Sequence, residues 1–275
     1  MSKRRLRAGF VGRLGYAEGL RLQELARERL LAARSTPDRA GPDRAGPDRE
    51  KPEREKREET LLLLEHPHVY TLGRNARRAD VKATADWLER HGVEVHETDR
   101  GGQVTYHGPG QLVGYPILDL DPDRRDLRRY VRDLQEVLIA TLDELGIPAF
   151  PGGDAAAIGV WVEGARGREK IASIGVHVKR WITTHGFALN VSSDLSMFGG
   201  IVACGLPDVT MTSIARCLES SAGSASGLEE VSSLLVAHFA RVFEREPAPL
   251  RRADALAWLS APRPALPIAS DAVVS

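Results

Sequence analysis

The sequence has few cysteines, no net charge and no long apolar run, and each absence narrows the possible functions. Two cysteines in 275 residues cannot supply a disulfide framework. Lysine plus arginine (38) equal aspartate plus glutamate (38), so no global field steers the chain to nucleic acid or to an anionic membrane. No segment approaches the roughly 20 apolar residues of a membrane span, and the basic N-terminus lacks a signal-peptide core. We expect a soluble, cytoplasmic monomer that recognises any macromolecular partner locally.

Signatures of metal and nucleotide sites are also missing. No group of histidines and cysteines has the spacing of zinc ligands. The glycine-rich stretch from Arg100 to Gln111 contains neither the Gly-Lys-Ser/Thr of a Walker loop nor a GxGxxG fingerprint. We therefore expect neither a metal nor a cofactor.

The composition predicts one domain over residues 1–261, with an insert at 35–59 and a tail at 262–275. The insert repeats Pro-Asp-Arg-Ala-Gly and continues as a charged run, with no apolar residue larger than alanine. Such a stretch cannot bury enough apolar surface to offset the entropy lost on ordering. We expect the insert to be disordered.

Helices and strands interleave without a regular βαβ period, which predicts an α/β fold with a mixed, largely antiparallel sheet and packed helices. The apolar patterns predict strands at residues 6–14, 60–64, 69–73, 93–98, 112–120, 158–162, 170–178 and 183–191. They predict helices at residues 18–34 and 83–90, a helix starting at Asp121-Pro122 and ending at Gly146, and a final helix at 228–243.

Cys204 is the first candidate for chemistry. It lies in the turn-like run Ala203-Cys204-Gly205-Leu206-Pro207, whereas Cys217 lies in an ordinary apolar setting. A free cysteine is often only a small buried hydrophobe. A thiol beside a buried amine can instead exist as a thiolate, which is a nucleophile. That second interpretation suggests covalent acyl transfer.

Lys170 could supply the amine. Strict alternation places Lys170, Ala172, Ile174, Val176 and Val178 on one face, so lysine begins an otherwise apolar face. The alternative is a strand-end lysine whose ammonium reaches water. On this strand Ser173 and Gly175, and on the next Gly186 and Ala188, form small faces that a ligand or neighbouring side chains could fill.

The stretch Arg100 to Gln111 and two histidines complete the set of candidates. Paired glycines let the backbone approach a ligand, although two tight turns would also explain them. Arg100, Thr105 and His107 add polar groups that a plain turn does not need. His107 and His185, which shares a face with Phe187 by alternation, are alternative proton carriers or structural histidines.

Four segments together resemble the lipoyl(octanoyl) transferase family. They are His66 to Gly73, RGGQVTYHGPGQLVGY at Arg100 to Tyr115, KIASIGVHVKRWITTHGFALN at Lys170 to Asn190, and Ala203-Cys204-Gly205. The resemblance implies the α/β fold of biotin and lipoate ligases. It also implies octanoyl transfer from octanoyl-acyl carrier protein to a lysine of lipoyl domains, in 2-oxoacid dehydrogenase complexes and the glycine cleavage H protein.

The resemblance also implies roles for residues. Cys204 would be the nucleophile and Lys170 the residue that activates it. The acyl site would be lined by Arg100, Gly101, Gly102, Gln103, Val104, Thr105, Tyr106, His107, Ser173, Ile174, Gly175, Gly186, Phe187 and Ala188. Two features depart from the family pattern: Ala203 stands where proline is common, and the insert is unusual.

Two other functions are compatible with parts of the sequence. An ATP-dependent lipoate ligase on the same fold would need no nucleophilic cysteine. A non-catalytic protein that binds lipoyl domains would need neither Cys204 nor Lys170. Dependence on ATP and turnover would separate the three.

Overall fold

The computed structural model describes residues 3–35, 58–152, 158–164, 167–205, 209–220 and 227–261. Residues 36–57 of the expected insert, the tail from residue 262 and residues 221–226 before the last expected helix lie outside this range. Glu59, which we placed in the insert, instead begins a strand. Its carboxylate is fully buried and pairs with Arg245 at 2.5 Å, which explains why a charged residue is accommodated there.

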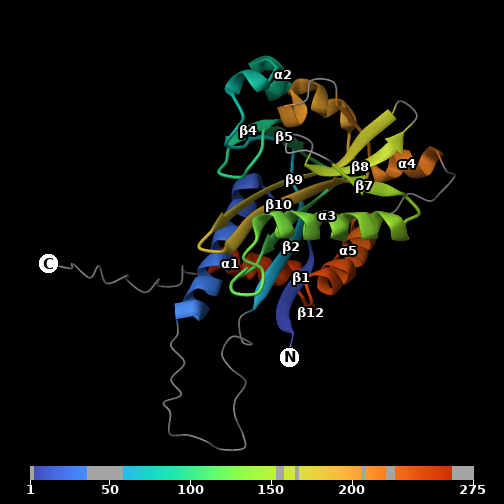
Figure 1. Cartoon of the computed structure of the whole chain (residues 1–275). Helices are drawn as coiled ribbons and strands as arrows, with labels where there is room; N and C mark the ends of the chain where they lie inside the picture. The colour runs from blue at the N-terminus through green and yellow to red at the C-terminus, as the bar shows by residue number, and fades with distance from the viewer. Residues whose placement is uncertain are drawn as a thin grey trace, which may run out of the picture.

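A mixed sheet of nine strands forms the centre of the described fold, as the interleaved pattern predicted (Figure 1). Its strands are β1 (Arg4–Arg13), β2 (Glu59–Glu65), β6 (Gln111–Ile117), β7 (Ala149–Pro151), β8 (Gly159–Gly164), β9 (Gly167–Lys179), β10 (Ile182–Asn190), β11 (Thr210–Met211) and β12 (Arg245–Pro249). Their order is β12-β1-β2-β6-β10-β9-β8-β7, and β11 pairs with β9. The pairs β1–β12, β1–β2 and β9–β11 are parallel, and the other pairs are antiparallel.

Helices cover both faces of this sheet. The helices are α1 (Tyr16–Ser35), α2 (Ala85–Arg90), α3 (Leu127–Glu144), α4 (Ile214–Ser220), α5 (Leu228–Val242) and α6 (Arg252–Ser260). One apolar core lies between the sheet and α3, α4 and α5, and a second lies between the sheet and α1 and α6. On β2, Leu61 and Leu63 enter the first core, whereas Leu62 and Leu64 enter the second. Each such fully buried leucine contributes about 1.5–3 kcal/mol, so the leucine run fixes β2 in the middle of the sheet.

A second, three-stranded sheet was not predicted as a separate unit. It contains β3 (Val69–Leu72), β4 (Glu94–Glu97) and β5 (Val104–His107), and with α2 it lies at one end of the large sheet, away from β12 (Figure 1). Its apolar side packs on two 3₁₀ segments, Leu195–Gly200 and Ala203–Gly205. The small sheet therefore supports the turn that carries Cys204.

The predicted start of one helix was wrong. The helix expected at Asp121-Pro122 begins instead at Leu127, because the Asp126 carboxylate caps it by accepting from the N–H groups of Arg128 and Arg129. The Asp121 carboxylate pairs with Arg34 and Arg125. The helix does end before Gly146, whose φ of 75° is the left-handed conformation that terminates helices.

The helix expected to be the last is also followed by more structure. β12 pairs with β1, and α6 packs Ala255 and Trp258 into the second core. Two of the five residues of β12 are prolines, Pro247 and Pro249. Proline in strands is found mainly at the edges of sheets, so the sequence pattern did not indicate this edge strand.

Candidate active site

The backbone at Cys204 is strained. Cys204 has φ 56° and ψ 17°, and Gly205 follows with φ 70°. A left-handed conformation at a residue other than glycine is uncommon and occurs at functional sites more often than elsewhere. A methyl group on Gly205 would lie 2.9 Å from Cγ of Gln103, so the turn packs directly against the glycine-rich loop. The remaining expected turn residues, Leu206 and Pro207, lie outside the described residues.

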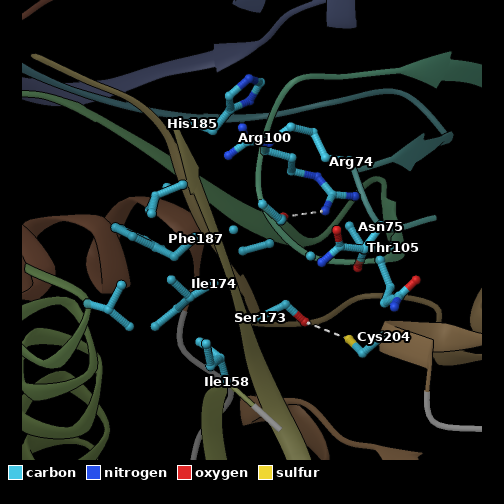
Figure 2. A pocket seen from close by; sticks show the side chains of 18 of the residues that line it. Arg74, Asn75, Arg100, Thr105, Ile158, Ser173, Ile174, His185, Phe187 and Cys204 are labelled. Carbon is cyan, nitrogen blue, oxygen red and sulfur yellow. Dashed lines mark hydrogen bonds between the residues drawn. The ribbon is translucent and has the colours of Figure 1, made fainter. Parts of the chain in front are cut away.

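Lys170 and Ser173 both contact the thiol. Lys170 Nζ donates to Cys204 Sγ at 3.3 Å. Ser173 Oγ lies 3.7 Å from the same sulfur (Figure 2). Lys170 is 1% exposed, so its ammonium does not reach water as the alternative interpretation required. Lys170 and Ser173 are three residues apart, so strict alternation would place their side chains on opposite faces of the strand.

A β-bulge explains this departure from alternation. In the β8–β9 register Val160 pairs with Ala172 and Trp161 pairs with Lys170, which leaves Ile171 as the extra residue. Such an insertion shifts the side-chain parity of the strand by one residue. The predicted face of Lys170 was therefore wrong. Ile171 joins Ala172 in the core under α3, and Lys170 turns toward Cys204 on the side of Ser173.

The stem of Lys170 is enclosed by β8. Its ammonium lies 5.4 Å from the centre of the Trp161 ring, a cation–π distance. A methyl group at Gly159 would lie 2.7 Å from Cε of Lys170. Gly159 therefore leaves the space through which the lysine reaches the sulfur.

Arg100 holds the glycine-rich loop and lines the same cavity. Its guanidinium donates to Thr71 O (2.5 Å), Thr71 Oγ1 (2.8 Å) and Gly101 O (3.1 Å). Arg100 is 7% exposed and forms no ion pair with a described carboxylate. Arg100 Nε and the hydroxyl of Thr105 are buried without a partner among the described residues. Buried donors of this kind are costly unless a ligand satisfies them.

His107 is neutral in this structure. Gln111 Nε2 donates to Tyr106 O (3.1 Å) and Asn190 Oδ1 (2.9 Å), so Gln111 Oε1 accepts from His107 Nδ1 at 2.8 Å. His107 Nε2 is then free to accept from Thr71 Oγ1 at 3.4 Å. Burial lowers the pKa of His107 to about 3. This fixed tautomer favours a structural histidine over a proton carrier.

His185 lies on the other side of the sheet from its predicted position. Its φ is 56°, which interrupts the alternation of β10. The backbone N–H of His185 donates to the side chain of Gln23 in α1. The His185 ring packs edge-on against Tyr115 in the second core, whereas Phe187 enters the first core. Burial lowers the pKa of His185, although its ring also hydrogen-bonds the Asp99 carboxylate at 2.8 Å. The described hydrogen-bond partners of Cys204 include neither His185 nor His107.

These groups surround a cavity of about 740 Å³. Gly175 pairs with Gly186 and Ser173 with Ala188 across β9 and β10, so the small residues form one continuous patch on its wall. The expected residues that line the cavity are Arg100, Gly101, Gly102, Gln103, Val104, Thr105, His107, Lys170, Ser173, Ile174, Gly175, Gly186, Phe187, Ala188 and Cys204. Tyr106 does not: its ring is buried beside Tyr70 and Phe198.

Several other lining residues were missed by sequence reasoning. They are Tyr16, Arg74, Asn75, Tyr115, Leu127, Arg128, Val131, Arg132, Ile158, Val176, His185 and Gly205, of which His185 was considered only as a base. Leu127, the first residue of α3, is 48% exposed at the cavity. Arg74 and Asn75 directly follow a segment of the family motif, which was the one available signal.

The described part of the chain has neither a metal-binding cluster nor a membrane-spanning helix. No group of three or more histidines, cysteines and acidic residues there could hold a metal ion. No helix in the described ranges is long and apolar enough to cross a membrane.

Comparison with known proteins gives a consistent family. Residues 50–240 match the lipoyl protein ligase A/B catalytic domain. A protein named octanoyltransferase from Solibacter usitatus is 46% identical over 239 residues, which cover 87% of this chain and 93% of the relative. Another octanoyltransferase, from Acidobacterium capsulatum, is 42% identical, and the match covers 94% of each chain.

Solved structures show the same fold. A bipartite lipoate protein ligase from Thermoplasma acidophilum superposes with a TM-score of 0.62 and 16% identity, covering 94% of this chain and 91% of the other. Lipoate-protein ligase A bound with ATP gives 0.63 and 15% identity, covering 94% and 93%. These likenesses concern the fold alone, and they confirm the predicted fold class. The family match and the identities with the two octanoyltransferases show that the chain belongs to the octanoyltransferase family of lipoyl protein ligase A/B catalytic domains and is a transferase of octanoyl groups in lipoylation.

Proposed function

We propose that the chain transfers octanoyl from octanoyl-acyl carrier protein to a lysine of a lipoyl domain through a thioester on Cys204. The observation that carries this proposal is the 3.3 Å contact between Lys170 Nζ and Cys204 Sγ at the wall of the cavity. The acceptors are the lipoyl domains of 2-oxoacid dehydrogenase complexes and the glycine cleavage H protein. Cys204 is a free thiol, consistent with a cytoplasmic enzyme.

The first half-reaction uses Lys170 as a cation. At 3.3 Å and an effective dielectric of 20, the attraction between an ammonium and a thiolate is about 5 kcal/mol before desolvation is subtracted. The thiolate attacks the carbonyl carbon of the carrier thioester and forms a new carbon–sulfur bond. The carbon–sulfur bond to the carrier breaks, and the departing thiolate takes the proton of Lys170. One thioester replaces another, so no ATP is consumed.

The second half-reaction uses Lys170 as a base. The amine of the acceptor lysine attacks the acyl-enzyme carbonyl, and the neutral Lys170 accepts the proton that this amine loses. The carbon–sulfur bond to Cys204 breaks and an amide forms. Lys170 is an ammonium again and Cys204 a thiolate, so the site returns to its starting state.

The cavity offers groups for the rest of the acyl donor. Ile158, Ile174 and Phe187 lie together on its apolar wall, where an alkyl chain can pack (Figure 2). The unpartnered Arg100 Nε and Thr105 hydroxyl can each donate to an oxygen of a bound ligand. Burial of these donors without a partner supports a cavity that binds a partly polar molecule.

The test is intact mass after incubation with octanoyl-carrier protein without ATP, followed by peptide mapping. We expect one octanoyl group on Cys204, which leaves when a lipoyl domain is added and gains it. Cys204→Ser should lose the adduct and turnover while remaining folded. Cys217→Ser is the matched control, because burial raises the pKa of the Cys217 thiol and Cys217 does not line the cavity. Modification of the acceptor only with free acid and ATP would instead identify a lipoate ligase.

A further inference from the structure

One segment beside the active site carries an unusual excess of positive charge. The nine residues from Arg74 to Lys82 include three arginines and one lysine, and all four side chains are exposed. Asp80 is the only acidic residue among these nine. The whole chain has no net charge, so this basic segment is a local feature.

Among the described residues, only one of the four charges of the basic segment has an ion-pair partner. Asp80 is buried, and its carboxylate accepts from the backbone N–H of Arg77 at 2.7 Å and lies 3.4 Å from the Arg77 guanidinium. Arg74, Arg78 and Lys82 form no ion pair with any described carboxylate. Like charges this close in sequence repel one another, so the segment is a favourable place for an anion.

The basic segment is attached to the turn that carries the thiol. The N–H groups of Lys82 and Ala83 donate to Gly200 O at 2.8 and 3.0 Å, and Val202 N–H donates to Asp80 O at 2.8 Å. Two residues after Val202 comes Cys204. An anion bound on this segment is therefore held by the same piece of backbone that positions the sulfur.

Side chains lead from the basic segment into the cavity. Arg74 and Asn75 line it together with Gln103, which packs on Gly205 beside Cys204. Figure 2 shows Arg74, Asn75 and Thr105 in succession on the side of the cavity where Cys204 lies. Within the described residues no hydrogen bond occupies the side-chain amide of Asn75 or Gln103, so both can hydrogen-bond a ligand that itself contains amides.

We propose that Arg74 and Arg78 bind the phosphodiester of the phosphopantetheine arm on which the carrier protein presents the octanoyl thioester. This inference rests on the proposed function, which requires such a donor. The arm combines a phosphate at one end, two amides along its length and the thioester at the other end. The same order of groups runs along the protein: guanidinium at Arg74, amides at Asn75 and Gln103, thiol at Cys204. Arginine is well suited to phosphate because its planar donors contact two oxygens at once.

A second basic edge of the cavity provides the matched comparison. Arg128 and Arg132 are one helical turn apart on α3 and also line the cavity without an ion pair to a described carboxylate. The Asp126 carboxylate caps the same end of α3 and accepts from the backbone N–H of Arg128 at 2.8 Å. The pKa of Asp126 is lowered mainly by the backbone N–H of Arg129, and also by the charges of Arg132 and Arg128. The Asp126 carboxylate thus partly neutralises the charges of Arg128 and Arg132. We therefore assign the phosphate to Arg74 and Arg78 of the basic segment.

The experiment compares two donors on the full-length protein. Octanoyl-carrier protein has the phosphate, whereas octanoyl-N-acetylcysteamine has a short, uncharged arm. The quantity measured is the ratio of their kcat/KM values for acylation of Cys204. We expect Arg74→Glu with Arg78→Glu to lower this ratio by about ten- to a hundredfold, the value of one or more lost hydrogen bonds to a charged group. Arg128→Glu with Arg132→Glu, an identical change in charge, should leave the ratio near that of the unaltered protein.

Two results would overturn the inference. An unchanged ratio in the Arg74 and Arg78 variant would show that the phosphate is not bound there, and an equal or larger loss in the Arg128 and Arg132 variant would place it on α3. Added salt should also lower the ratio in the unaltered protein and have less effect in the Arg74 and Arg78 variant. Failure of both donors to acylate Cys204 would count against the proposed function itself, whereas acylation with an unaltered ratio would reject only the phosphate site.

Discussion

Acidification from pH 7.5 to 5 should destabilise this protein through two buried histidines. Burial lowers the pKa of His107 to about 3 and that of His66 to about 4. His66 Nδ1 donates to Leu14 O, and its Nε2 accepts from Tyr115, both at 2.8 Å, so the native structure uses the neutral ring. In the unfolded chain both rings return to an ordinary pKa near 6.5. The unfolded state therefore binds more protons between these values, and stability falls as the pH falls.

The magnitude follows from the two pKa values. At pH 5 an unfolded histidine is almost fully protonated, whereas both native rings remain largely neutral. Each difference then costs about 2 kcal/mol relative to pH 7.5, or about 4 kcal/mol for the pair. A loss of that size is a large fraction of the roughly 5–15 kcal/mol that stabilises a typical protein. His185 adds to the effect in the same direction, because burial lowers its pKa too.

Denaturant unfolding at several pH values between 5 and 7.5 measures this effect. His66→Asn keeps a donor toward Leu14 O but does not titrate. Between pH 7.5 and pH 5 the free energy of unfolding of this variant should therefore fall by about 2 kcal/mol less than that of the unaltered protein. The comparison of slopes is independent of any constant cost of the substitution. His91→Asn is the matched control, because His91 is exposed on the surface. An identical slope in the His66 variant and the unaltered protein would refute the buried, neutral state of His66.

Two further substitutions test the active site. Lys170→Arg keeps a cation beside Cys204 but removes the proton acceptor, because arginine stays protonated; single-turnover assays should show acyl-enzyme that forms and then transfers to the acceptor about 10²- to 10⁴-fold more slowly. Equal transfer rates and pH profiles would exclude Lys170 as the base. Gly175→Ala places a methyl group 2.9 Å from Gly101 O and 3.2 Å from Cδ of Arg100, so it should impair octanoyl transfer in a folded protein. Gly199→Ala, where nothing lies within 4 Å, should not, and equal activity of the two variants would show that this wall of the cavity is not used.

The sequence predicted the parts of the fold that depend on regular side-chain patterns. The leucines of β2 are buried on both faces, and Gly146 ends α3, because burial and left-handed glycine leave clear signals in composition. The small residues of β9 and β10 were also found by alternation, and they pair directly across the two strands on one wall of the cavity.

The parts that sequence patterns missed depend on single irregular residues. The extra residue Ile171 reverses the parity of Lys170, and the positive φ of His185 moves its ring to the opposite face. Neither feature contains the glycine or proline that usually marks an irregular backbone. The proximity of Lys170 to Cys204, 34 residues apart, came from the family resemblance and not from any pattern of spacing.

The state of the ionisable groups limits which of them can move a proton during catalysis. Burial keeps His107 neutral, and it raises the pKa of Tyr115 and that of Tyr16, the latter to about 12, so all three stay uncharged near neutral pH. No aspartate or glutamate is among the described residues that line the cavity. Apart from His185, which hydrogen-bonds Asp99, the ionisable groups left at the wall are arginines, which do not deprotonate, and the Lys170–Cys204 pair. A transfer in two half-reactions needs a group that gives up a proton in the first and takes one back in the second. At the described wall of the cavity, the Lys170–Cys204 pair can supply that group.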